Sequence, residues 1–438
     1  MNSVAPHTAF TVAPWPGLQP RLLHAGPHTE DLDSYRAAGG YRTLTDPAGL
    51  LEDIELAGLV GRGGAAFPLA VKIRTVRHAG PLGPGGRDTV VVANGEEGEP
   101  ASVKDRWLLR NRPHLILDGL RLVATLVGAK HAHVYVSDSQ SGASVQDALD
   151  HAGTDALGGL TVSLRSVEPG YVAGEESAAV RAINGGPAKP TDKPPRPFSS
   201  GVGGLPTLIS NVETLANVPG IQHHGAAQYR AHGTEASPGT FLATVTAAGT
   251  TPGLYELPFG TPVSDLLELH GIATDRVRGV LMGGYFAGLL NRDVLNTTLD
   301  HESLRGLGSG LGCGAVSVIT DECPVAVAAA VLSYFDRENA GQCGSCFNGT
   351  AAMAAVAEAL RDGTATDDDI ARLQRWSVVL RGRGACATLD AATNIAASLL
   401  ARFPAEVSAH LRADCTVCTT TVFTAHRPFE VEALEVGR

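Results

Sequence analysis

Short runs of branched apolar residues alternate with segments of helical periodicity over the first half of the chain. Residues 89–93 read TVVVA and residues 131–136 read HAHVYV, which is typical of strands. The first run is continuous, as expected for a strand buried on both faces. Between them, apolar residues recur at helical spacing over residues 113–127. Strands that alternate with helices predict an α/β domain.

The pattern changes near residue 239. Residues 240–246 and 253–257 are strand-like and residues 263–270 are helix-like, which predicts a small strand–strand–helix module. Beyond residue 319 the chain is rich in alanine and leucine. That part predicts four helices, at residues 326–337, 351–361, 366–381 and 393–403.

Two segments lack both periodicities. The first forty residues are rich in Pro, His and Gly and predict an irregular lead-in. Residues 187–206 are dense in Pro, Lys and Gly, and a loop of this length inside a compact domain is usually functional. We therefore expect a lead-in over residues 1–40, units at residues 41–236, 237–318 and 319–412, and an extension over residues 413–438.

The composition narrows the class of protein. The 438 residues suffice for two or three domains, and 44% hydrophobic with 18% charged residues is typical of a globular chain. A net charge of -11 argues against a nucleic-acid partner. No apolar run approaches the roughly 20 residues of a membrane-spanning helix, and the polar start lacks a signal-peptide pattern. We expect a cytoplasmic protein without direct membrane insertion, where free thiols and metal sites are commoner than disulfides.

Two loops carry candidate chemistry. Residues 61–68 read GRGGAAFP and are followed by Lys72; such a loop closes backbone N–H groups around a phosphate, although the same composition also suits an ordinary turn. Residues 92–100 read VANGEEGEP and follow the buried strand, where ligands bind in an open α/β sheet. Acidic side chains in this position bind a metal ion, accept hydrogen bonds from the hydroxyl groups of a sugar or ribityl chain, or are simply exposed to solvent. Residues 172–177, VAGEES, repeat this pattern after Tyr171.

These motifs stand in order with the loop at residues 189–197 and with GLPTLISNVET at residues 204–214. Together they resemble the FMN- and NADH-binding subunit of respiratory complex I, a family shared with flavin subunits of NAD-reducing hydrogenases and formate dehydrogenases. The likeness runs from about Leu51 to about Leu411. It implies an α/β fold class with a Rossmann-like FMN-binding domain, a ubiquitin-like β-grasp insert of the SLBB type, and a C-terminal four-helix iron–sulfur domain.

The resemblance also implies residue roles. The FMN phosphate would be held by Gly61, Gly63, Gly64 and Lys72. The ribityl chain and ring would be surrounded by Asn94, Glu96, Glu97, Tyr171, Gly174, Glu175, Asn211 and Thr214. Glu99 and Glu176 would lie near the nicotinamide nucleotide, with Phe67 and Lys193 at its outer end. Glu97 and Glu176 are the candidate catalytic acids, acting through electrostatics and hydrogen bonding because hydride transfer needs no protein nucleophile.

The chain departs from the family where the nucleotide binds. The family has aromatic rings soon after the residue matching Lys72 and directly after the Lys-Pro-Pro that begins here at Lys193, and both rings are missing. Arg74, Arg77 and Arg196 stand nearby, and arginine stacks on adenine or pairs with a phosphate. Three interpretations stay open: weaker NADH binding, a preference for NADPH, or electron exchange with a protein such as a ferredoxin.

The seven cysteines fall into three groups. Cys343, Cys346 and Cys386 match family ligands of a [4Fe–4S] cluster, but Ala340 stands where the family has a fourth cysteine. Three alternatives stay open for these three cysteines: they bind a [3Fe–4S] cluster, they bind a [4Fe–4S] cluster whose fourth ligand comes from elsewhere, or they bind no cluster. Cys415 and Cys418 form a Cys-x-x-Cys pair that suits zinc, redox chemistry or a returning cluster thiolate. Cys313 and Cys323 are expected to be small buried hydrophobes.

The sequence thus predicts an FMN-dependent oxidoreductase subunit of the NAD(P)H dehydrogenase type. It would pass electrons between a nicotinamide dinucleotide and an iron–sulfur protein subunit of ferredoxin-like or thioredoxin fold, with peripheral association with a larger membrane complex as an option. Two alternatives remain: an FMN relay between protein partners without a nucleotide site, and a non-catalytic assembly subunit.

Overall fold

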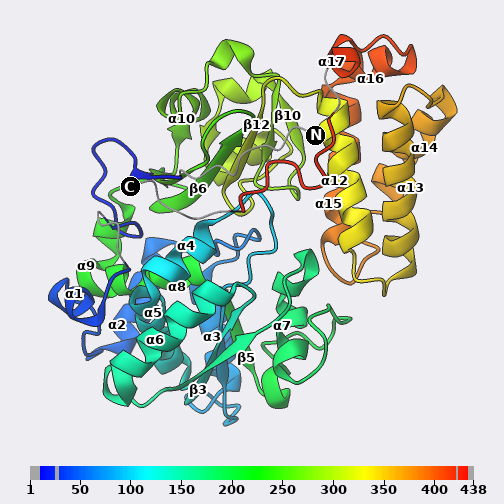
Figure 1. The fold of residues 1–438 in the computed structure, drawn as a ribbon. Helices are drawn as coiled ribbons and strands as arrows, with labels where there is room; N and C mark the ends of the chain where they lie inside the picture. The colour runs from blue at the N-terminus through cyan, green and yellow to red at the C-terminus, as the bar shows by residue number, and fades with distance from the viewer. Residues whose placement is uncertain (1–9, 25–28, 421–422, 433–438) are drawn as a thin grey trace.

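The computed structural model describes residues 10–24, 29–420 and 423–432, and within them it contains two main sheets and a helical bundle (Figure 1). The predicted α/β domain is present. Its sheet has four parallel strands in the order β4-β3-β2-β5. These strands are β2 (Val90–Asn94), β3 (His131–Val136), β4 (Thr161–Ser166) and β5 (Thr207–Asn211).

Helices pack around this sheet. Helix α5 (Pro113–Val127), predicted from its apolar periodicity, is buried along nearly its whole length and contacts β2. Its side chains join those of β2 and β3 in the main core of the domain. The other helices of this domain are α1 (Leu32–Ala37), α2 (Pro47–Ala57), α3 (Leu69–Ala79), α4 (Lys104–Asn111), α6 (Ser139–Ala156), α7 (Glu176–Ile183), α8 (Val212–Ala216) and α9 (Val218–Arg230).

The strand order reverses beside β2. The chain runs from β2 outward to β3 and β4 and then returns to place β5 on the other side of β2. Asn94 and Asn211 are paired in register at the carboxyl ends of β2 and β5. A reversal of this kind opens a crevice between the strand ends, which is where open α/β sheets bind their ligands.

The second sheet forms the predicted β-grasp module. It has the order β1-β7-β6-β12-β9-β10, and α10 (Val263–Leu269) packs in the same module. Its strands β6 and β7 coincide with the predicted ones to within a residue or two. The strands are β1 (Thr11–Pro14), β6 (Thr240–Ala247), β7 (Gly253–Pro258), β9 (Gly279–Met282), β10 (Leu289–Asn291) and β12 (Ala315–Ile319), with β8 (Thr261–Pro262), β11 (Thr298–Leu299) and α11 (His301–Gly306) beside them.

The lead-in differs from the expectation for residues 1–40. Strand β1 pairs parallel with β7, on the edge of the second sheet, and α1 follows. The expectation of an irregular segment was wrong for these residues because a four-residue edge strand among prolines is too short to show a period. The lead-in therefore connects the β-grasp module with the α/β domain.

The C-terminal bundle contains the four predicted helices. They are α12 (Pro324–Glu338), α13 (Gly344–Arg361), α14 (Asp367–Val379) and α15 (Thr388–Arg402). Two short helices follow at one end of the bundle, α16 (Pro404–Leu411) and α17 (Thr416–Thr420) (Figure 1). The structure therefore confirms the predicted fold class.

The C-terminal segment, residues 423–432, returns from the bundle toward the α/β domain (Figure 1). The Val431 N–H donates to the Pro100 carbonyl over 3.1 Å, and Arg106 Nη2 donates to the Val431 carbonyl over 3.0 Å. In the part of the chain that the structure describes, no helix is long and apolar enough to cross a membrane.

Candidate functional site

The glycine loop lies on the end of β5. The Arg62 N–H donates to Thr214 Oγ1 over 2.9 Å. A Cβ atom on Gly63 would stand 3.3 Å from the Cβ of Asn211, so a larger residue would push the loop and Asn211 apart by a few tenths of an ångström. The structure thus brings the predicted phosphate loop to the crevice between β2 and β5.

The two acidic loops meet above β2. Asn94 Nδ2 donates to the Gly174 carbonyl over 2.8 Å, and a Cβ atom on Gly174 would stand 2.7 Å from Glu96 Oε2. Glu96 is buried, and burial raises the pKa of its carboxyl to about 8. Its Oε2 atom has no hydrogen-bond partner among the described residues. Buried polar atoms normally have a hydrogen-bond partner. The unpaired Oε2 atom of Glu96, next to Gly174, therefore fits a site for a polar ligand such as FMN.

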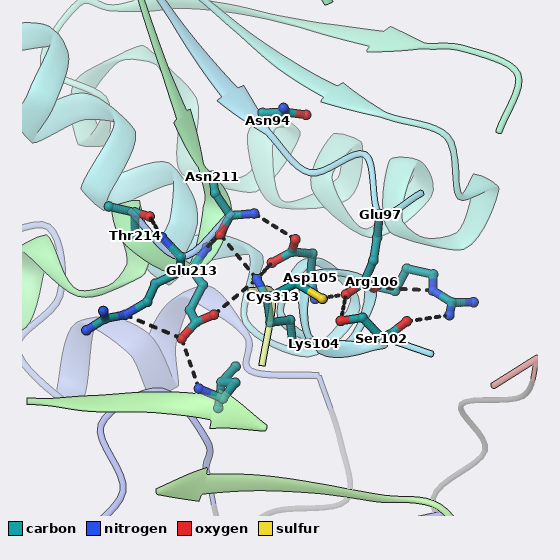
Figure 2. Close-up of polar contacts among 12 residues, drawn as sticks. Asn94, Glu97, Ser102, Lys104, Asp105, Arg106, Asn211, Glu213, Thr214 and Cys313 are labelled. Carbon is teal, nitrogen blue, oxygen red and sulfur yellow. Dashed lines mark hydrogen bonds and ion pairs between the residues drawn. The ribbon is translucent and has the colours of Figure 1, made fainter. Parts of the chain in front are cut away.

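A buried ionic network supports the end of β5 (Figure 2). Lys104 Nζ lies 2.7 Å from Asp105 Oδ1 and 3.1 Å from Glu213 Oε2, and all three side chains are almost fully excluded from solvent. Asn211 Nδ2 donates to Asp105 Oδ2 over 2.7 Å. Arg62 Nε lies 3.8 Å from Glu213 Oε1, so two cations face two anions. The network holds Asn211 at the crevice.

Glu97 binds the first turn of α4. Its carboxylate accepts hydrogen bonds from Ser102 Oγ over 2.7 Å and from the N–H groups of Asp105 and Arg106 over 3.1 Å each (Figure 2). An anion at the start of a helix satisfies its free N–H groups. Glu97 is therefore held firmly where it faces the neighbouring cleft.

This cleft has a volume of about 320 Å³ and lies between the acidic loop and α12. Glu97, Glu99 and Tyr171 line one side, and Tyr334 and the C-terminal segment line the other. Its size is in the range of ligand pockets. Burial raises the pKa of Glu99 to about 8, even though its Oε2 atom accepts the N–H of Tyr285 over 3.0 Å.

The acids of α7 bind the long loop. Glu175 caps α7 by accepting the N–H of Ser177 over 2.8 Å, and Lys193 forms ion pairs with both Glu175 and Glu176. Lys193 and Glu176, both predicted to lie near the nucleotide, are thus close together. Phe67 is 46% exposed, so its ring is available to a ligand.

The basic residues of α3 face other partners. Lys72 Nζ donates to the Ile209 carbonyl of β5 over 3.0 Å, and burial lowers the pKa of its ammonium group. Arg74 pairs with Glu55, and Arg77 donates to the Leu126 carbonyl over 3.3 Å. Leu126 lies in the last turn of α5 and so at the amino edge of the sheet, because this helix runs back from the carboxyl edge of β2 to the start of β3. The structure directs Arg77 away from the crevice.

The three predicted cluster cysteines converge. Cys343, Cys346 and Cys386 line one small pocket together with Ala340. Three convergent thiols fit an iron–sulfur group, with Ala340 leaving one side without a thiolate.

Cys415 and Cys418 lie elsewhere, beside Cys323. Cys323 precedes the 15-residue helix α12, and Ala340 follows that helix. At 1.5 Å per residue the two ends of α12 are about 22 Å apart. The Cys-x-x-Cys pair therefore does not supply the missing cluster thiolate. Cys323 was expected to be a small buried hydrophobe. It is buried in the core of the bundle, as expected, and its thiol also lies beside His410, Cys415 and Cys418.

Sequence reasoning missed the buried ionic network. Lys104 and Asp105 precede Leu108 and Leu109 by four residues each, so both charges stand on the apolar face of α4. Charged residues at apolar positions of an amphipathic helix were the available signal.

Comparisons with known proteins agree with this geometry. Residues 54–220 match the family model of the Nuo51 FMN-binding domain, and residues 326–410 match the NADH-ubiquinone oxidoreductase-F iron-sulfur binding region. The F 2 subunit of the NADH-quinone oxidoreductase of Rhizobium meliloti is 33% identical over 401 residues, covering 87% of this chain and 94% of that protein. This chain belongs to the family of NADH-quinone oxidoreductase F subunits. The F subunit of the Mycobacterium tuberculosis enzyme is 31% identical, covering 86% and 88% of the two chains.

Solved structures extend the family likeness. An NAD+-reducing [NiFe]-hydrogenase in the air-oxidized state matches with a TM-score of 0.76 and 32% identity over 84% of this chain. This chain spans only 63% of that hydrogenase chain. The H2-reduced state matches with a TM-score of 0.77 and 30% identity, over 89% of this chain and 68% of that one.

The comparisons confirm the predicted family, fold class and function. The chain is an FMN-dependent oxidoreductase subunit of the NADH dehydrogenase type, and it carries an iron–sulfur binding region. Its relatives are named as subunits of larger enzymes.

Proposed function

We propose that this chain takes electrons from NADH and delivers them, through FMN and an iron–sulfur centre, to a partner subunit. The observation that carries the proposal is the crevice between β2 and β5, where Asn94 and Asn211 stand in register beside the glycine loop. When bound there, FMN supplies the exchange between a two-electron hydride and single electrons.

The chain's own residues bind and orient the reactants. The backbone of Gly61, Gly63 and Gly64 would hold the FMN phosphate, with Lys72 adding positive charge. The hydrogen-bonding groups for the ribityl chain and ring would come from Asn94, Glu96, Glu97, Tyr171, Gly174, Glu175, Asn211 and Thr214. Glu96, with its free Oε2 atom, offers a carboxyl group that can form a hydrogen bond with a polar ring edge.

The nucleotide would enter through the cleft lined by Glu97, Glu99 and Tyr171, with Glu176, Lys193 and Phe67 toward the long loop. The relatives are named NADH-quinone oxidoreductase subunits, which favours NADH over NADPH, and Arg77 already has a partner at the amino edge of the sheet. Glu97 and Glu176 would act by positioning, because both carboxylates are held by hydrogen bonds or an ion pair.

Cys343, Cys346 and Cys386 would hold the iron–sulfur centre. The partner would be an iron–sulfur protein of ferredoxin-like or thioredoxin fold, and the site of action the cytoplasm, in a larger complex attached to a membrane surface.

The test is anaerobic mixing of purified protein with NADH and, separately, with NADPH. We expect a flavin spectrum that NADH bleaches faster than NADPH does. Colourless protein that takes up no FMN contradicts the proposal. Bleaching by reduced ferredoxin but by neither nucleotide identifies the relay between proteins instead.

A variant of Glu176 tests where the nucleotide binds. Glu176→Gln is expected to raise the apparent KM for NADH severalfold while the flavin content stays the same, because the ion pair with Lys193 weakens. Glu168→Gln, an exposed acid on the preceding loop, is the matched control and leaves KM unchanged.

A further inference from the structure

Four potential metal ligands meet at the end of the bundle where α16 and α17 lie (Figure 1). Cys323 precedes α12, His410 lies in the last turn of α16, and Cys415 and Cys418 stand at the start of α17. Their ligand atoms all lie within 4.8 Å of one another. Cys323 and His410 are buried and the other two are half-buried.

The distances match the corners of one small coordination sphere. Cys323 Sγ lies 3.9 Å from Cys415 Sγ, and His410 Nε2 lies 3.2 Å from Cys323 Sγ and 3.6 Å from Cys418 Sγ. Tetrahedral zinc with ordinary bond lengths places two sulfurs about 3.8 Å apart and a sulfur and a nitrogen about 3.6 Å apart. An iron–sulfur cluster fits less well, because its thiolates bind different irons and stand farther apart.

The imidazole of His410 is oriented for metal binding. Its Nδ1 atom lies 3.0 Å from the Arg361 carbonyl oxygen. A carbonyl only accepts, so Nδ1 carries the proton and Nε2 presents its lone pair to the three sulfurs. A backbone carbonyl behind a ligand histidine is the usual support of a zinc site.

Two helix starts also lie beside the sulfurs. The N–H groups of Val325 and Ala326, at the start of α12, face Cys323, and those of Val417 and Cys418, in α17, face Cys415. The first N–H groups of a helix have no partner within it, so they are free to support a bound thiolate.

We propose that Cys323, His410, Cys415 and Cys418 bind a single Zn²⁺ ion in a closed structural site. Three cysteines and one histidine, with no position left for a substrate, are a ligand set of structural zinc. The site is separate from the three cluster cysteines, because Cys323 precedes α12 and the pocket of those cysteines, with Ala340, follows it. Three of the four ligands, all but His410, also lie outside the matched residues 326–410.

The ion would anchor the C-terminal segment. Beyond α17 this segment crosses α12, where the Arg337 side chain donates to the His426 carbonyl over 2.7 Å, and reaches Pro100 and Arg106. Arg427 and Glu430 of the segment line the cleft beside the crevice. A fixed α17 therefore holds one wall of that cleft in place.

Metal analysis of the full chain, purified anaerobically from zinc-replete cells, tests the proposal. We expect about one zinc per chain in the natural protein. The double variant Cys415→Ser/Cys418→Ser should lose zinc and keep iron, whereas Cys343→Ser/Cys346→Ser/Cys386→Ser should lose iron and keep zinc. Thr419→Ala/Thr420→Ala, on the same helix, is the matched control and should keep both metals.

Two further measurements do not depend on how well the serine variants fold. His410→Cys retains four zinc ligands and should keep zinc, whereas His410→Leu should lose it. After a chelator has removed zinc from the iron-free triple variant, added cobalt should give the ligand-field bands of tetrahedral Co²⁺, at longer wavelengths than oxidised flavin absorbs. Trypsin should cut after the exposed Arg412, which lies between His410 and Cys415, severalfold faster when zinc is removed.

The proposal is overturned by natural protein without zinc, by zinc that survives Cys415→Ser/Cys418→Ser, or by loss of iron in place of zinc from that variant. A disulfide between Cys415 and Cys323 in protein purified without oxygen would also overturn it. These outcomes are independent of NADH oxidation, so failure of the zinc site and failure of the proposed function are distinguishable.

Discussion

Glu96 loses most of its contact with water on folding, and its Oε2 atom meets no hydrogen-bond donor among the described residues. Burial raises the pKa of its carboxyl to about 8, so the folded protein holds a proton there that the unfolded chain releases above about pH 4.5. The stability that this proton contributes is complete below about pH 4.5 and is lost as the pH rises toward 8.

Glu96→Gln removes this titration. Relative to the natural protein, the variant should gain free energy of unfolding between pH 5 and 8, by on the order of 1–3 kcal/mol. Urea unfolding of FMN-free protein at several pH values measures the gain. The exposed Glu235→Gln serves as control, and parallel pH curves for Glu96→Gln and the natural protein would refute the assignment.

Ala340 lines the pocket of the three cluster cysteines at the place of the family's fourth thiolate. Ala340→Cys should therefore complete the set of four thiolates that a [4Fe–4S] cluster takes. We expect a variant that holds about four irons per chain and loses them to a chelator several times more slowly than the natural protein. Ala351→Cys, farther along α13, is the control; equal rates of loss for Ala340→Cys and the natural protein would exclude a role for this position.

At the scale of elements, buried ion pairs hold the start of α4 in place. Lys104 is shared between Asp105 of its own helix and Glu213 at the start of α8, and Arg62 of the glycine loop joins from the other side. Figure 2 shows Lys104, Asp105 and Glu213 converging below the end of β5, while Asn94 stands apart on the neighbouring strand. The network thus couples the phosphate loop to two helices and a strand.

Lys104→Met leaves two buried carboxylates without their shared cation. The expected loss is about 3–5 kcal/mol of unfolding free energy. The double variant Lys104→Met/Glu213→Gln should cost at least about 1 kcal/mol less than the sum of its parts, because it removes one charge of each sign. A double-mutant cycle by urea unfolding measures this coupling, and additive losses would mean that the two side chains act independently.

At the scale of the whole molecule, the carboxylate of Glu256 fixes the lead-in, which connects the α/β domain with the β-grasp module. Glu256 of β7 accepts the N–H groups of Arg21, Leu22 and Leu23 and the hydroxyl of Thr240, with no solvent exposure. Leu22 and Leu23 belong to the core of the α/β domain, while β7 belongs to the β-grasp module. The acid therefore fixes the lead-in between the two domains.

Glu256→Ala leaves three buried N–H groups without an acceptor. Each unpaired group costs about 1–3 kcal/mol, so a total loss of at least about 3 kcal/mol is expected, with faster tryptic cleavage after Arg21. Glu256→Gln keeps an acceptor oxygen and should lose less. Equal losses for the two variants would show that the charge, and not the set of hydrogen bonds, holds the lead-in.

Much of the fold follows from local pattern. The apolar run at residues 89–93, the strand at residues 131–136 and the four helices of the bundle occur where the sequence predicts them, because each has a period that a single element reveals. The same is true of the motifs: glycines, acids and the Cys343–Cys346 pair identify the family because their chemistry is carried by neighbours in the chain.

What the sequence by itself determined is therefore the family, the fold class and the residue types offered to FMN and to an iron–sulfur group. Tertiary structure alone decided which distant residues meet. It placed β1 on the second sheet, gave Lys104 its second anion at Glu213, and brought His410, 87 residues away, beside the buried Cys323. Such contacts have no period along the chain, because they arise only when separately formed elements pack together and each buried polar atom must find a partner.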